Sequence, residues 1–63
     1  MNDNMAIQIL MKTRGKKCKV TYCESLIIID ADFYKIVVNP NKIFCDGEEI
    51  NKAELFEKLE VMI

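Results

Sequence analysis

The sequence contains no histidine and no tryptophan, and Arg14 is its only arginine. Histidine is the side chain that titrates near neutral pH, so its absence removes the commonest general base and a frequent metal ligand. The chain also lacks a glycine-rich phosphate loop, a metal-binding motif and a nucleophile in a recognisable setting. The sequence therefore predicts a protein that is not an enzyme and that binds no cofactor or metal.

Cysteine is scarce and occurs in an odd number, as Cys18, Cys23 and Cys45, with no Cys-x-x-Cys pair. This is a poor basis for a disulfide framework. Cys18 and Cys23 are five positions apart, so on one strand they face opposite sides of a sheet and cannot share a metal. All three are expected to be reduced and to fill space like small apolar side chains.

Targeting and membrane-spanning segments are not expected. The first charged residue, Asp3, is acidic, and the apolar stretch at 5–11 is interrupted by Gln8. A secretory signal instead has a basic start and an apolar run of about 7 to 15 residues. The longest uninterrupted apolar run, Leu26–Ile29, is far shorter than the ~18 residues of a membrane span. We expect a cytoplasmic location and no membrane partner.

The length of 63 residues supports a single domain over residues 1–63. Hydrophobic residues make up 51% of the chain and charged residues 30%, as in globular rather than disordered proteins. The formal net charge is −1. This balance argues against wholesale coating of nucleic acid, which requires a strongly basic domain.

Alternating apolar and polar residues predict β-strands. Residues 5–12 are expected to form a first strand, with Met5, Ile7, Ile9 and Met11 on one face. A hairpin turn at Gly15 would join it to a second strand over 17–23. Further strands are predicted at residues 26–29, 33–38 and 43–45, with a short return over 48–50 after the Asp46-Gly47 turn.

The last element is predicted to be a helix over Lys52–Met62. Asn51 is a favourable N-cap, and Glu54 three residues later completes a capping-box pattern. Short connections make the sheet antiparallel. The predicted fold class is therefore α+β, a small antiparallel sheet of four to five strands joined by hairpins, with one C-terminal α-helix packed on one face.

The predicted sheet has more apolar surface than one helix can cover. Leu26 and Ile28 point to one face while Ile27 and Ile29 point to the other. A second apolar face on so small a domain should not face water. Three arrangements would bury it, namely a sheet that curls closed, a pair of copies packed face to face, or a foreign partner. We expect a homodimer.

Charge is distributed unevenly along the chain. Residues 1–23 hold five basic residues and one acidic residue, a net charge of +4, whereas residues 24–63 have a net charge of −5. The basic residues are Lys12, Arg14, Lys16, Lys17 and Lys19. Such a cluster is typical of a loop that binds nucleic acid, a nucleotide or another anion. It is also typical of a solvated hairpin whose charges discourage edge-to-edge pairing, and we favour this second interpretation.

These observations favour a small interaction module, a homodimer that binds or occludes another macromolecule. Accessory and inhibitor proteins of phages and mobile elements are often of this size and lack catalytic residues. The candidate interaction residues are Ile27, Ile29, Phe33 and Val37. The alternative is a binder of nucleic acid or a small anionic ligand through the predicted basic hairpin Lys12–Lys19.

Overall fold

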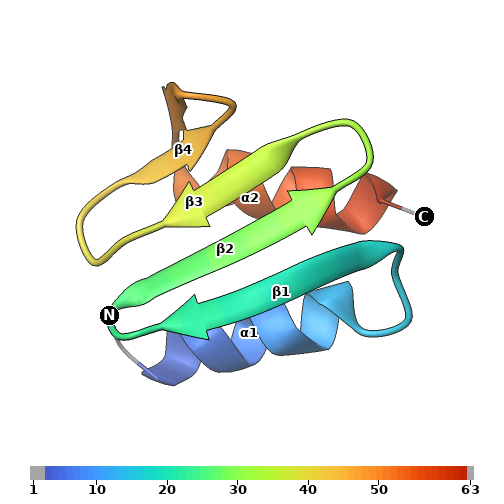
Figure 1. Ribbon diagram of the computed structural model, residues 1–63, viewed down its shortest axis with the longest axis horizontal. Helices are drawn as coiled ribbons and strands as arrows, with labels where there is room; N and C mark the ends of the chain where they lie inside the picture. The colour runs from blue at the N-terminus through green and yellow to red at the C-terminus, as the bar shows by residue number, and fades with distance from the viewer. Residues whose placement is uncertain (1–2, 63) are drawn as a thin grey trace.

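A computed structural model describes residues 3–62 as a five-stranded antiparallel sheet with two helices on one side of it (Figure 1). The strand order in the sheet, β1-β2-β3-β4-β5, is also the order along the chain. The elements are α1 (Asp3–Thr13), β1 (Cys18–Cys23), β2 (Leu26–Ala31), β3 (Lys35–Val38), β4 (Ile43–Cys45), β5 (Glu48–Ile50) and α2 (Lys52–Val61). The predicted fold class, a small α+β domain with an antiparallel sheet and a C-terminal helix, is confirmed.

The predicted first strand over residues 5–12 is wrong, because this segment belongs to α1. Its apolar residues fit a helical period as well as an alternating one. Met5, Ile9 and Thr13 recur every four residues and face the sheet, with Ile9 fully buried. The buried Thr13 hydroxyl donates to the Ile9 carbonyl over 2.8 Å, so even the polar member of this row has a partner within the helix.

Gly15 ends this helix instead of turning a hairpin. Its φ of +76° is the left-handed conformation that glycine adopts without steric cost and that commonly follows a helix C-terminus. The Lys16 amide donates to the Thr13 carbonyl over 3.1 Å, which closes the last turn. The predicted need for positive φ at Gly15 is confirmed, although the element that it terminates is different.

The later turns form as their residues predict. Asp46 and Gly47 both have positive φ, at 52° and 85°, as a two-residue hairpin turn requires. The Asn39 side chain accepts hydrogen bonds from the amides of Asn41 and Lys42, at 3.1 and 2.7 Å. These two turns set the pairing of β3 with β4 and of β4 with β5.

Helix α2 begins at the predicted capping box. The Glu54 amide donates to the Asn51 side chain over 2.8 Å, and the Asn51 amide donates to the Glu54 carboxylate over 3.4 Å. Leu55 and Leu59 are fully buried against the sheet. The helix is therefore confirmed to within one residue of its predicted end.

Both helices cover the same face of the sheet. The pairing places Val20, Ile29, Ile36 and Cys45 next to one another across four strands on that face. The buried apolar side chains that form the core are Ile9, Ile27, Ile29, Ile36, Val38, Ile43, Leu55 and Leu59. The opposite face carries no helix in the described part of the chain. Neither helix within residues 3–62 is long and apolar enough to cross a membrane.

Candidate functional site

The sheet face that the helices leave open carries a row of apolar side chains. Ile28, Val37 and Phe44 lie directly opposite one another on β2, β3 and β4. All three are partly buried by their neighbours, and Leu26 on the same face is exposed. Because neighbouring strands are about 4.8 Å apart, the three paired side chains form one continuous strip across the sheet. We call this strip, with Leu26, the open-face strip.

Charges of both signs border the open-face strip. Lys19, Asp30 and Lys35 are paired across β1, β2 and β3, so Asp30 lies between two lysines on this face. On the other side, Glu49 is paired with Phe44. All four charged side chains are exposed. A surface with an apolar centre and an alternating border of charge resembles a protein-binding surface more than a basic groove for nucleic acid.

The structure separates the four predicted interaction residues. Ile27 and Ile29 are only 2% and 0% exposed because they lie under the helices, so they cannot contact a partner of the folded chain. The surface that β2 presents instead consists of Leu26 and Ile28. Val37 lies in the open-face strip, two strands from the edge strand β1.

Phe33, the fourth predicted residue, lies in the turn between β2 and β3 and is 91% exposed. It lines a mainly apolar hollow of about 320 Å³ together with Lys17, Tyr34 and Val61. The Tyr34 hydroxyl donates to the Lys58 carbonyl over 3.0 Å, which fixes this corner to α2. Phe33 therefore belongs to a surface at one end of the molecule and not to the open-face strip.

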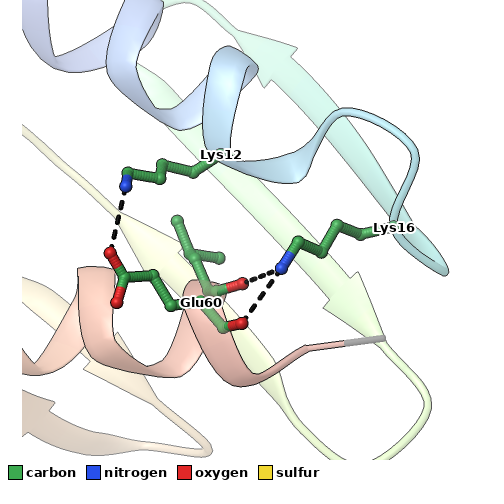
Figure 2. Close-up of polar contacts among 4 residues, drawn as sticks. Lys12, Lys16 and Glu60 are labelled. Atoms are coloured by element: carbon green, nitrogen blue, oxygen red, sulfur yellow. Dashed lines mark hydrogen bonds and ion pairs between the residues drawn. The ribbon is translucent and has the colours of Figure 1, made fainter.

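Two of the five clustered basic residues bind to α2, one from α1 and one from the loop that follows it. The Lys16 ammonium donates to the carbonyls of Leu59 and Glu60, at 2.9 and 3.1 Å, and Lys12 pairs with the Glu60 carboxylate at 3.0 Å (Figure 2). The carbonyls at a helix C-terminus lack partners within the helix and carry partial negative charge. Lys16 thus supplies the hydrogen bonds that the last turn of α2 would otherwise lack.

The remaining cations of this cluster are dispersed. Arg14, Lys17 and Lys19 are exposed, and Lys19 is paired with Asp30 in the sheet. The predicted basic hairpin Lys12–Lys19 is not a hairpin, because its first half is the end of α1.

The cysteines are free and lie on both sides of the sheet. Cys18 and Cys45 are partly buried on the helix side, whereas Cys23 is exposed on the open face. Burial raises the pKa of the Cys18 and Cys45 thiols, although Lys16 and Lys58 each oppose this rise. A raised pKa keeps a thiol protonated and weakens it as a nucleophile. Within residues 3–62, no three potential ligands lie close enough together to hold a metal ion.

A wider hollow of about 760 Å³ lies between the turn at residues 39–42 and the start of α2. Its charged side chains include Lys42 and Lys52 as well as Glu49 and Glu54, so no single charge dominates it. The Glu54 amide at the helix N-terminus is already bonded to the Asn51 side chain. This hollow therefore lacks the convergent donors that would define an anion site.

The sequence interpretation missed the outer side of α1. Ile7, Leu10 and Met11 are 53%, 57% and 68% exposed. The strand interpretation had placed Ile7 and Met11 on the same face as Ile9. A period of 3.6 residues places them on the side of the helix away from Ile9, where the structure finds them.

Comparison with known proteins gives no relative from which a role could be transferred. No protein-family model, curated protein or solved structure matches the chain. The chemistry of the described surfaces is therefore the basis for a functional interpretation.

Proposed function

We propose that this chain is a small, non-catalytic interaction module that acts as a homodimer and binds or occludes another protein. The observation that carries the proposal is the open-face strip, Leu26, Ile28, Val37 and Phe44, on the side of the sheet without helices. Occlusion of a partner surface is the mode of action expected of the accessory class of phage and mobile-element proteins.

The core does not require the open-face strip. The eight buried apolar side chains lie between the sheet and the two helices, on the other face. Apolar side chains left on the water side of a small sheet favour association, because burying them against a partner removes that surface from water. Binding to a partner, rather than folding, therefore explains best why these apolar side chains occur on the open face.

The charge pattern favours a protein as the partner. Asp30 and Glu49 border the same strip as Lys19 and Lys35, so a polyanion would meet repulsive as well as attractive charges. Two cations of the basic cluster, Lys12 and Lys16, are already bonded to α2. The nucleic-acid alternative consequently has less support than a protein partner.

We place the interaction in the cytoplasm. All three cysteines are free, and reducing compartments keep thiols in this state. Cys23 is exposed next to the open-face strip, where an oxidising compartment would promote pairing with another thiol.

Affinity capture from the source cells, with and without nuclease, tests the proposal when wild type is compared with Val37→Lys. Lysine at Val37 places a charge in the middle of the strip and should abolish capture of the partner. Val61→Lys is the matched control, because Val61 is 74% exposed on α2. Circular dichroism establishes that both variants are folded.

Capture that survives nuclease, persists in Val61→Lys and disappears in Val37→Lys supports the proposed function. A protein partner that Val37→Lys retains would show that the open-face strip is not the binding surface. A capture that nuclease abolishes would favour the nucleic-acid alternative instead.

A further inference from the structure

We propose that the homodimer forms at the hollow beside Phe33, with Phe33 of each copy entering the hollow of a second copy across a two-fold axis. The surface that makes this contact, which we call the Phe33 corner, consists of Lys17, Asp32, Phe33, Tyr34 and Val61. This inference rests on the proposed function and deepens it, because it places self-association away from the open-face strip.

Phe33 is an aromatic side chain that projects into water from a fixed turn. It is 91% exposed, more than any other large apolar side chain in the described part of the chain. The Ala31 amide donates to the Tyr34 carbonyl over 3.0 Å, and the Tyr34 hydroxyl donates to the Lys58 carbonyl over 3.0 Å. These bonds hold the turn in place, so little freedom of the backbone is lost when Phe33 binds. A rigidly held aromatic side chain is the usual anchor of a protein interface.

The hollow beside Phe33 can receive such a side chain. It is mainly apolar, with a volume of about 320 Å³, and Tyr34 and Val61 form part of its wall. The projecting side chain and the hollow therefore belong to one patch, as a self-complementary contact across a two-fold axis requires. A small foreign ligand would account for the hollow but not for the aromatic side chain that projects beside it.

Two opposite charges at the hollow also favour a second copy as the occupant. Lys17 precedes β1 and Asp32 follows β2, and the pairing of Cys18 with Ala31 brings these two ends together (Figure 1). Both side chains line the hollow and are exposed. Within residues 3–62, neither side chain forms a hydrogen bond or an ion pair.

A two-fold axis that passes between Lys17 and Asp32 exchanges their positions. Lys17 of each copy then lies at Asp32 of the other, and two equivalent ion pairs flank the inserted Phe33 side chains. A partner with charge of a single sign would instead meet one attractive and one repulsive charge at this hollow. The contact is closed after two copies, since each patch is occupied by the other.

The size of the Phe33 corner sets the expected strength of the dimer. Five residues per copy are fewer than the roughly 20 residues a side of a standard stable interface. We therefore expect a concentration-dependent equilibrium with a dissociation constant on the order of micromolar or weaker. Each copy carries its own open-face strip, so capture of a partner does not require the dimer.

Analytical ultracentrifugation of the full chain, from roughly 10 μM to roughly 1 mM, tests the inference over the range of weak association. Phe33→Ala should raise the dissociation constant by at least ~10-fold, because it removes the anchor of the contact. Its exposure means that this variant should fold. Tyr22→Ala is the matched control, because Tyr22 is an aromatic side chain that is 50% exposed at the other end of β1, and it should leave the dissociation constant unchanged.

A mixture of two charge-reversed variants tests the exchange of Lys17 and Asp32. Lys17→Asp and Asp32→Lys each put like charges on both sides of the contact, so each variant alone should dimerise more weakly than wild type. A 1:1 mixture should associate at least ~3-fold more tightly at low salt than either variant alone, a modest gain because exposed ion pairs are individually weak. Pairing within one chain cannot produce this preference, because the attractive charges come from different copies.

A chain that stays monomeric at the highest concentration would overturn the inference. Equal effects of Phe33→Ala and Tyr22→Ala, or a mixture no tighter than its components, would also overturn it. A dimer that Val37→Lys dissociates and Phe33→Ala does not would overturn it as well, and would indicate copies packed face to face. The proposed function fails separately, when Val37→Lys still captures the partner, so the two failures are distinguishable.

Discussion

Lys16 offers a direct test of whether the basic cluster is structural. Its ammonium group donates to two carbonyls in the last turn of α2, at 2.9 Å from Leu59 and 3.1 Å from Glu60. Lys16→Met keeps most of the aliphatic chain but removes both donors and the positive charge. We expect this variant to lose folding stability without a change of fold.

The magnitude follows from the two hydrogen bonds and their exposure. A hydrogen bond to a charged group contributes about 1.5 to 3 kcal/mol when well shielded. One bond is partly buried and the other is exposed, so solvent screens part of this contribution. A total of about 1 to 2 kcal/mol remains, which lowers the melting temperature of a domain of this size by roughly 4 to 16 °C.

Thermal and urea denaturation of Lys16→Met, beside Lys17→Met, measure this loss. Lys17 is the neighbouring residue and is exposed, so its variant carries the same charge change and should stay within about 0.5 kcal/mol of wild type. Equal stability of the two variants would refute the structural role of Lys16. It would also return Lys16 to the set of cations available for anion binding.

Local contacts give three further predictions. Asn51→Ala should cost about 1 kcal/mol in urea denaturation, because it removes the side-chain cap of α2; a neutral result would mean that the capping box contributes nothing. Burial raises the pKa of the Cys18 and Cys45 thiols and of the Tyr34 hydroxyl above their ordinary values, so the folded state retains these protons to higher pH than the unfolded state. The stability that these groups contribute should accordingly be complete below about pH 9 and fall as the pH rises above it, and an unchanged urea midpoint at alkaline pH would contradict this. An aromatic disulfide reagent should modify Cys23 first, because it is exposed; simultaneous modification of all three thiols in the folded protein would show that burial does not protect Cys18 and Cys45.

Elements with distinctive local chemistry could be predicted from the sequence. The Asp46-Gly47 turn and the Asn51 cap each depend on residue types that few other conformations favour. The apolar alternation of β2 correctly placed Ile28 and Ile29 on opposite faces, but the predicted interaction site joined Ile27 and Ile29 to Val37, which lies on the other face of the sheet. These segments are flanked by turn residues, which fix where each alternation begins and ends.

The first element could not be predicted in the same way. Residues 5–11 are almost entirely apolar, so the segment satisfies a period of 2 and a period of 3.6 equally well. Its true state is decided by tertiary packing, since α1 covers the part of the sheet that α2 cannot reach. Because α1 was not predicted, the candidate site included Ile27 and Ile29, which lie beneath the helices. The same error left out Ile7 and Leu10, which are exposed.

The proposed function requires the open-face strip to be accessible to a partner, and methyl-group accessibility to a soluble gadolinium chelate tests this requirement most directly. The measurement is made by NMR on the isolated protein, with buried Ile29 as the protected reference. We predict clearly stronger relaxation of the Ile28 and Val37 methyl groups than of the Ile29 methyl groups. Equal protection of all three residues would contradict the account, because the open-face strip would then be unavailable to a partner.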